Sequence, residues 1–199
     1  MVMKTAILTV GTRGSGKTTF CKKVKSLHPE VILLCRDDYF DEHFGRHTFD
    51  PLTGDIESAI ESFWGYATKM ILNSPVDSVF LIDFWTIYEF SRKKIIARLY
   101  DAGISEVRCW FFNTPLETNI CWFIERETNV PNSKEFYEFC VRRDYWSFRE
   151  NVSDILLRGV QEDDADNCQL DPKREWYRFH FDQIVVVNPI TDPPELISI

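Results

Sequence analysis

The 199-residue chain lacks long apolar runs, paired cysteines and repeated segments. No run approaches the roughly 20 apolar residues that cross a bilayer, and residues 1–4 lead into a strand pattern without the anatomy of a secretory signal. The six cysteines form no C-x-x-C pair, which indicates free thiols rather than a disulfide framework. These absences exclude membrane-spanning, repeat and small disulfide-rich proteins. We expect one cytoplasmic domain over residues 1–199, without membrane association and with no protein partner that the sequence identifies.

Basic charge is also scarce. The chain has 23 lysines and arginines against 31 acidic residues, a net charge of −8. Proteins that grip long duplex DNA through many phosphates are normally basic. The charge therefore disfavours extensive nucleic-acid binding but allows a transient contact between an enzyme and its substrate. Much of the acidity falls in residues 162–166, which we interpret as a solvated loop.

One short segment carries a specific signal. Residues 11–18 read Gly-Thr-Arg-Gly-Ser-Gly-Lys-Thr and fit the pattern G-x-x-x-x-G-K-[ST] at every fixed position. Such a loop curls so that its backbone N–H groups face phosphates, its lysine reaches the β and γ phosphates, and its hydroxyl ligates Mg²⁺. A glycine-rich turn with no ligand is the alternative. The predicted ligands are ATP and Mg²⁺, and the predicted nucleotide-binding residues are Gly11, Thr12, Arg13, Gly14, Ser15, Gly16, Lys17, Thr18 and Thr19.

Apolar, β-rich runs alternate with helical patterns along the chain. Strands are expected over residues 5–10, 31–35, 79–83, 106–112 and 184–187. Helices are expected over residues 19–25, 54–73, 91–101, 116–127 and 133–145, with a further helix to about 157. Continuous apolar strands separated by helices imply a parallel sheet that is covered on both faces. The sequence therefore predicts an α/β fold, a three-layer P-loop NTPase sandwich with a five-stranded, mainly parallel sheet.

Two adjacent carboxylates follow the second predicted strand, in the run Arg36-Asp37-Asp38-Tyr39. In an open parallel sheet, residues just past the carboxyl ends of the strands line the ligand crevice. Adjacent side chains cannot both face one way, so we expect one carboxylate to face the site and the other to point away. A carboxylate placed there could accept the proton of an attacking hydroxyl. Capping of the following turn is the alternative.

A third carboxylate, Asp83, ends the strand over residues 79–83 and suits Mg²⁺ coordination beside Thr18. No glutamate follows Asp83, and the chain has no Asn-Lys-x-Asp motif for guanine. Both absences favour transfer to a hydroxyl acceptor over nucleotide hydrolysis.

Arg126 is the candidate for neutralising charge on the transferring phosphoryl group, because it follows the fourth predicted strand in a helical segment. Arg142, Arg143 and Arg149 are alternatives on the next helical segment. A solvated or salt-bridging arginine is the simpler interpretation of each.

These segments resemble the polynucleotide kinase branch of the P-loop kinases, over roughly residues 4–145. The resemblance implies that Asp37 is the general base, that Arg126 is a lid arginine, and that Lys17 and Thr18 bind phosphate. The matches are Leu8 to Gly11 running into Gly14 to Thr19, the run Arg36 to Tyr39, and Asp83 followed by the basic residues Arg92, Lys93 and Lys94.

The chain also departs from that family. Phe40 stands where phage 5′-kinases have an arginine that grips the acceptor phosphate, and Trp122 replaces a second lid arginine. We expect no phosphatase domain after this segment. These departures weaken the expected grip on a nucleic-acid end.

Several small phage P-loop kinases resemble the same family and phosphorylate the hydroxymethyl group of 5-hydroxymethyluracil in DNA. An acceptor on a base calls for aromatic side chains that stack on it. Aromatic residues make up 15% of the chain, and residues 40–54, with His43, Arg46 and His47, form the expected acceptor loop unless they are an ordinary surface loop. The aromatics expected near the acceptor are Tyr39, Phe40, Phe44, Phe49 and Trp85.

The resemblance thus implies a kinase that uses Mg²⁺ and ATP, with nucleic acid, expected to be DNA, as a transient substrate. The order of expected acceptors is 5-hydroxymethyluracil in DNA, then a 5′-hydroxyl end, then a nucleoside or other small molecule. A non-catalytic nucleotide-dependent switch is the alternative from a different class.

Overall fold

The computed structural model describes residues 3–45, 56–126, 133–152 and 181–191. The acidic residues 162–166, the end of the predicted acceptor loop and Cys168 lie outside this part of the chain. Five strands form one sheet in the order β2-β3-β1-β4-β5, and every pair is parallel. The strands are β1 (Thr5–Val10), β2 (Ile32–Cys35), β3 (Val79–Asp83), β4 (Glu106–Phe112) and β5 (Gln183–Val187). The predicted fold class is confirmed, with a sheet that is wholly rather than mainly parallel.

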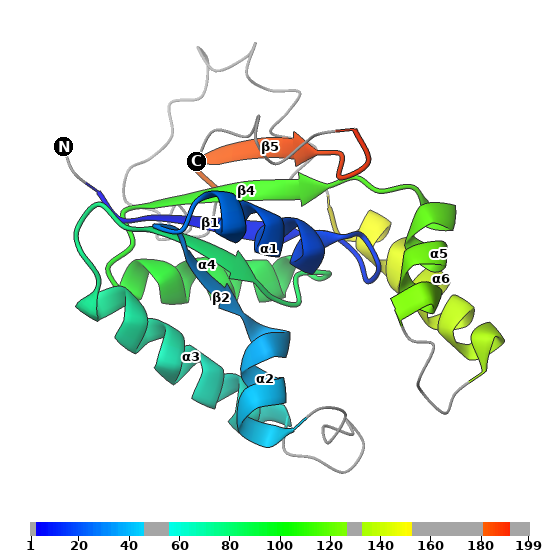
Figure 1. Cartoon of the computed structure of the whole chain (residues 1–199), viewed down its shortest axis with the longest axis horizontal. Helices are drawn as coiled ribbons and strands as arrows, with labels where there is room; N and C mark the ends of the chain where they lie inside the picture. The colour runs from blue at the N-terminus through cyan, green and yellow to red at the C-terminus, as the bar shows by residue number, and fades with distance from the viewer. Residues whose placement is uncertain (1–2, 46–55, 127–132, 153–180, 192–199) are drawn as a thin grey trace.

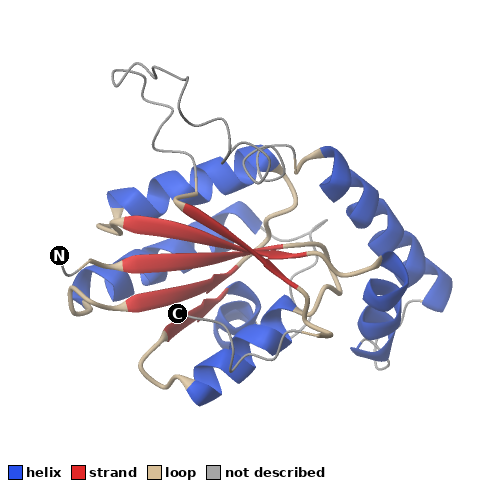
Figure 2. Ribbon diagram, turned by 90° about the horizontal axis from the view of Figure 1, so that it is seen from above, coloured by secondary structure: helices blue, strands red, loops and turns tan. Residues whose placement is uncertain are grey.

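Helices cover both faces of the sheet (Figures 1 and 2). Side chains alternate between the faces along each strand, so Leu8 packs toward α3 (Ile56–Asn73) and α4 (Glu89–Asp101), whereas Ile7 packs toward α1 (Lys17–Leu27). The side chains of Leu8 and Ile7 are both fully buried. This two-sided burial explains why the strands read as continuous apolar runs. Among the described residues, no helix is both long and apolar enough to span a lipid bilayer.

Two further helices lie beyond the carboxyl ends of β1 and β4 (Figure 1). They are α5 (Leu116–Arg126) and α6 (Lys134–Glu150), which pack together through a small apolar cluster. The sequence predicted a break near residue 145, but α6 is continuous to Glu150. Its buried side chains recur at helical spacing, and neither proline nor glycine interrupts it. The part of the predicted further helix beyond residue 152 lies outside the described residues.

The segment after β2 also differs from the prediction. A turn and loop were expected from Phe40, but Arg36–Phe44 form a helix, α2, directly at the end of β2. Tyr39 anchors this helix, because its ring packs against Phe63 and its hydroxyl lies 2.8 Å from the Ser62 hydroxyl on α3. Tertiary packing thus extends helical structure through a polar segment.

The strand order places β1 at the centre of the sheet, between β3 and β4. The loop that follows β1 therefore lies next to the end of β3, where Asp83 stands. Strand order reverses at β1, and ligands of open parallel sheets bind at such a point. The fold brings the predicted site residues together at the carboxyl ends of the strands.

Candidate active site

The loop between β1 and α1 has a backbone shape that requires glycine at two positions. Gly14 and Gly16 have φ angles of +73° and +86°. A Cβ atom on Gly14 would lie 2.3 Å from the carbonyl oxygen of Asn119, and one on Gly16 would lie 2.9 Å from the Trp122 ring. Close approach of α5 to the loop thus excludes larger residues there.

Buried hydrogen bonds hold the loop in this shape. Within the loop, the Ser15 hydroxyl donates to the Thr12 carbonyl at 2.8 Å. From outside, the Thr114 hydroxyl donates to the Ser15 carbonyl at 2.9 Å, and the Asn119 amide donates to the Thr12 hydroxyl at 2.8 Å. All four side chains are buried. Side chains from outside the loop therefore help to fix its shape, and Thr114 and Asn119 are structural residues that the loop motif could not reveal.

The Lys17 ammonium lies over the loop and donates to the carbonyls of Gly11 and Thr12, at 3.0 and 2.8 Å. Enclosure by protein lowers the pKa of Lys17, against the opposing effect of Asp83 and Asp37. A desolvated ammonium next to the N-terminus of α1 is suited to bind phosphate oxygens.

Thr18 and Asp83 meet as the sequence predicted. The Thr18 hydroxyl donates to one Asp83 oxygen at 2.6 Å, and the Thr9 hydroxyl donates to the other at 3.1 Å. The buried Cys35 thiol lies 3.7 Å from the Asp83 oxygen that accepts from Thr18. A hydroxyl and a carboxylate are oxygen ligands of the kind Mg²⁺ takes, with phosphates and waters completing its shell. The donor set fits the predicted metal.

The two adjacent carboxylates on α2 point in different directions, as predicted. Asp37 faces the same cavity as Lys17, whereas Asp38 forms an ion pair with Lys22 at 2.7 Å. Arg36 donates through Nε to Asp37 at 2.9 Å. Enclosure acts to raise the pKa of Asp37, but Arg36, and after it Arg126 and Lys17, outweigh this and hold the pKa below its usual value. Asp37 is therefore ionised at neutral pH and able to accept a proton.

Two cavities meet at the loop. The first, of about 460 Å³, is here called the Asp37 cavity. It contains Lys17, Thr18, Asp83 and Arg126 besides Asp37, so it brings together every predicted catalytic and metal-binding residue. Its remaining walls are Arg13, Gly14, Ser15, Gly16, Thr19, Arg36, Phe84, Trp85, Phe123, Phe136 and Tyr137.

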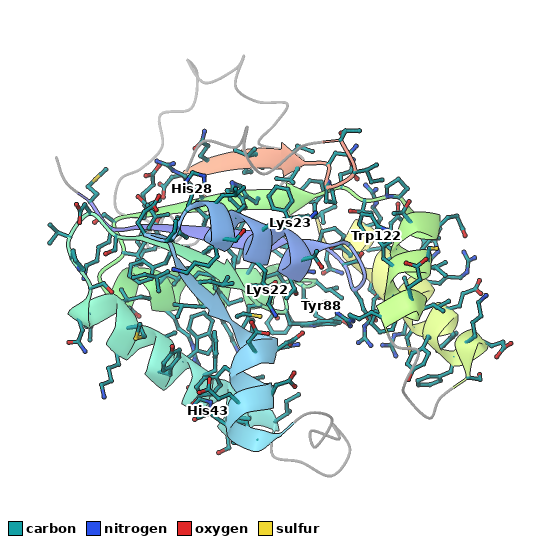
Figure 3. The ribbon with its side chains drawn as sticks, viewed as in Figure 1. Lys22, Lys23, His28, His43, Tyr88 and Trp122 are labelled. Carbon is teal, nitrogen blue, oxygen red and sulfur yellow. The ribbon has the colours of Figure 1, made fainter. Side chains whose placement is uncertain are left out.

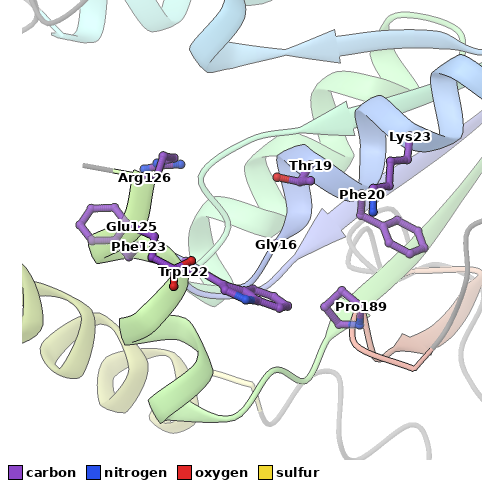
Figure 4. Close-up of a pocket in the computed structure, with 10 residues that line it drawn as sticks. Gly16, Thr19, Phe20, Lys23, Trp122, Phe123, Glu125, Arg126 and Pro189 are labelled. Carbon is purple, nitrogen blue, oxygen red and sulfur yellow. The ribbon is translucent and has the colours of Figure 1, made fainter. Parts of the chain in front are cut away.

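The second cavity, of about 470 Å³, lies on the other side of Gly14 and Gly16 and is here called the Trp122 cavity. The Trp122 indole lies between Gly16 and Pro189, with Lys23 at one end and Arg126 at the other (Figure 4). Trp122 and Lys23 come from α5 and α1 (Figure 3). A flat aromatic wall beside a phosphate loop has the shape and chemistry to hold a nucleoside. The sequence identified Trp122 only as a departure from a family pattern.

Arg126, at the end of α5, lines both cavities, and its guanidinium lies 5.0 Å from the centre of the Phe123 ring. The alternative arginines lie elsewhere on α6. Arg142 pairs with Glu117 and Glu138, Arg143 with Asp144, and Arg149 donates to Asn113 and Tyr145. Within the described part of the chain, none of these three lines either cavity.

The aromatic residues expected near the acceptor lie in different places in the structure. Trp85 lines the Asp37 cavity, but Tyr39 packs in the core, and Phe40 and Phe44 pack with it along α2. Phe49, Arg46 and His47 lie outside the described residues, and His43 stacks on Tyr39. The cavity takes its other aromatic walls from Phe84, Phe123, Phe136 and Tyr137. Phe84 follows Asp83 and could have been found from that position, whereas no sequence signal links α6 to the site.

The basic run at the start of α4 includes a structural residue. Arg92 is fully buried and donates to the carbonyls of Thr86 and Ile87, at 2.8 and 2.9 Å, and to that of Asn151. It ties the loop after β3 to the end of α6. Arg92 therefore joins two segments of the fold and does not itself line the Asp37 cavity.

Comparison with protein-family models gives no match, and no curated protein sequence matches the chain. Among solved structures, the chain is similar to a protein of Chloroflexus aurantiacus described as a kinase, with TM-score 0.53, 14% identity and coverage of 72% of this chain and 78% of that one. It is similar to a fungal RNA kinase, with TM-score 0.52, 14% identity and coverage of 97% and 78%. It is also similar to a chain of the Pnkp1/Rnl/Hen1 complex, with TM-score 0.50, 18% identity and coverage of 67% and 43%. At these identities the likeness shows the fold, which is that of the P-loop kinases.

Proposed function

We propose that this protein is a kinase that transfers the γ-phosphate of ATP to a hydroxyl group carried on a nucleic acid. The observation that carries the proposal is the Asp37 cavity, in which an ionised carboxylate shares one space with Lys17, Thr18 and Arg126. A nucleotide switch needs a carboxylate near Mg²⁺, the place of Asp83, but it has no acceptor whose proton a second carboxylate such as Asp37 would take.

In the proposed reaction, the loop and Lys17 bind the triphosphate, and the Trp122 cavity receives the nucleoside. The acceptor oxygen attacks the γ-phosphorus while its proton passes to Asp37. The bond from the γ-phosphorus to the bridging oxygen breaks, and ADP leaves. Arg126 offsets the charge on the moving group. Thr18 and Asp83 would hold Mg²⁺, which when bound neutralises charge on the β and γ phosphates.

Aromatic and cationic walls support a nucleic-acid acceptor. Phe84, Trp85 and Phe136 line the Asp37 cavity, and Arg36 lies 5.5 Å from the Phe84 ring centre. Aromatic side chains with interleaved arginines bind bases by stacking, largely independently of base type. Within this class we favour the hydroxymethyl group of 5-hydroxymethyluracil in DNA, because an extruded base would place its hydroxyl among these rings.

A 5′-hydroxyl end of a polynucleotide is the second candidate. The observation that favours it is the likeness in fold to the fungal RNA kinase over 97% of this chain. The absence of an arginine at position 40, where Phe40 stands, counts against it.

Transfer of label from [γ-³²P]ATP tests the proposal. Three acceptors are incubated separately with the protein: an oligonucleotide containing 5-hydroxymethyluracil, the same oligonucleotide with thymine and a free 5′-hydroxyl, and the parent nucleosides. We expect label on the first, at the base. Label on the 5′ end would select the second candidate. Label on nucleosides alone, or on no acceptor at all, would refute a nucleic-acid kinase.

A further inference from the structure

Arg13 belongs to the phosphate loop, but its side chain leaves the loop. Its guanidinium lies 5.3 Å from the ring centre of Trp85 and 5.3 Å from that of Phe123. Its Nε lies 3.0 Å from Oδ2 of Asp144, on α6. Three segments that are distant in sequence therefore hold this one cation.

The Asp144 carboxylate is buried and paired with other side chains. Its side chain is 6% exposed, and its second oxygen accepts from Arg143 at 2.9 Å. Burial of a carboxylate is costly unless it is paired, so a paired carboxylate of this kind fixes its partner in place. Asp144 orients the Nε edge of Arg13.

The contacts of Arg13 leave one edge of the guanidinium available. The two rings contact the group as cation–π partners, and Asp144 forms an ion pair with it at Nε. The described residues give its two terminal nitrogens no hydrogen-bond partner. Arg13 lines the Asp37 cavity and does not line the Trp122 cavity. The available edge thus belongs to the side of the loop where Arg36 and Asp37 lie.

Building on the proposed function, we infer that Arg13 binds a phosphate group of the acceptor, next to the hydroxyl that is phosphorylated. A planar guanidinium donates two parallel hydrogen bonds to a phosphate. In the Asp37 cavity, Lys17 and the loop N–H groups serve the donor phosphates, Arg126 serves the transferring group, and Arg36 is paired with Asp37. Of the cations that line this cavity in the described residues, Arg13 is the one that these roles leave for the acceptor. The acceptor is then a nucleotide unit that carries a phosphate, rather than a free nucleoside.

Kinetics with a matched acceptor pair test the inference. The pair is a trinucleotide with 5-hydroxymethyluracil at its centre, flanked by phosphodiesters, and the nucleoside 5-hydroxymethyl-2′-deoxyuridine. We expect Arg13→Gln to raise the KM for the trinucleotide by about 10-fold to 100-fold, the usual effect of losing a hydrogen bond to a charged group. The KM values for the nucleoside and for ATP should rise less than that for the trinucleotide, because neither substrate offers Arg13 a phosphate next to the acceptor hydroxyl. Arg13→Lys, which keeps the charge, should recover part of the loss.

A second variant tests the role of Asp144 as a positioning residue. Asp144→Asn should raise the KM for the trinucleotide in the same direction but less, with kcat little changed, and Asp144→Glu should restore part of it. Thermal denaturation of each variant shows whether it is folded. A folded Asp144→Asn with an unchanged KM for the trinucleotide would refute the positioning role.

Other outcomes contradict the inference about Arg13. A rise in the KM for ATP alone would make Arg13 a ligand of the donor. Equal losses on trinucleotide and nucleoside would make it a packing residue. If the wild-type protein phosphorylates neither acceptor, the proposed function fails, and calorimetric titration of the trinucleotide in the presence of ADP then decides the inference separately. Tighter binding by wild type than by Arg13→Gln supports it, and equal or absent binding refutes it.

Discussion

The two sides of the site, which we propose receive the donor and the acceptor, are built in different ways. The donor side is one continuous loop, whose shape depends on Gly14 and Gly16 and on hydrogen bonds that the Ser15 and Thr114 hydroxyls donate to loop carbonyls. The acceptor side is assembled from α2, the segment after β3, and helices α5 and α6. Phosphate loops bind phosphate mainly through backbone N–H groups, which a short motif can specify, whereas the proposed acceptor would be bound by side chains that only the fold brings together.

The largest expected effect separates chemistry from binding. Asp37→Asn should lower kcat by about 10²-fold to 10⁴-fold, because the acceptor loses its general base. ATP affinity should stay nearly intact, since the donor side does not depend on that carboxylate. Initial rates and calorimetric titration of ATP measure the two quantities.

The chain offers a matched control in the next residue. Asp38 is also a carboxylate on α2 but pairs with Lys22 away from the cavity. Asp38→Asn should change kcat by less than about threefold, because an exposed ion pair contributes little. Normal turnover by Asp37→Asn would show that Asp37 is not the base.

A substitution in the loop should break the donor side. Gly14→Ala should cost at least about 1–2 kcal/mol for its left-handed backbone. The new methyl group would also lie 2.3 Å from the Asn119 carbonyl oxygen, so the loop must move and ATP affinity should fall. Thermal denaturation and ATP titration measure both effects.

Gly65 provides the opposite case on the same chain. It lies in the middle of α3, and a Cβ atom there would meet nothing within 4 Å. Gly65→Ala should therefore stabilise the protein by about 0.5–1 kcal/mol and leave ATP affinity unchanged. A Gly14→Ala variant that behaves like Gly65→Ala would disprove the close approach of α5 to the loop.

A smaller effect should distinguish the two cavities. Trp122→Ala should weaken ATP binding by about 10-fold to 100-fold if the indole stacks on the base, because such stacking contributes roughly 1–3 kcal/mol. Trp122→Phe should retain most of the affinity, and the acceptor KM should not change with either variant. A rise confined to the KM for the acceptor would show that the Trp122 cavity binds the acceptor and not ATP.

The smallest effect is a shift in pH dependence. Arg36 is the strongest of the charges that lower the pKa of Asp37. The ionised base is present above this pKa, so activity should fall as the pH drops through it, below the usual aspartate range. In Arg36→Gln this charge no longer opposes the effect of enclosure, so the pKa of Asp37 should rise. The acidic limb of kcat/KM should then move to higher pH, with little change at neutral pH. A limb that stays in place would show that Arg36 does not tune the base.

Much of the fold was predictable because its signals are local. The apolar runs of β1, β3 and β4 and the periodicity of α3 each depend on a few adjacent residues. Segment α2 was not predictable, since its polar residues become helical through the packing of Tyr39 on α3. The unbroken length of α6 was missed because its buried stripe faces α5 and the end of the sheet.

The candidate site shows the same contrast between local sequence signals and tertiary packing. The sequence by itself determined the phosphate loop, the carboxylates Asp37 and Asp83 at strand ends, and the α/β fold, because each is written in neighbouring residues. Only the tertiary structure decided which aromatic residues line the Asp37 cavity, that Asp37 and not Asp38 faces it, and that Asp144 pairs with Arg13. Those relations join residues up to 131 positions apart, from Arg13 to Asp144, and chain folding alone brings such residues together.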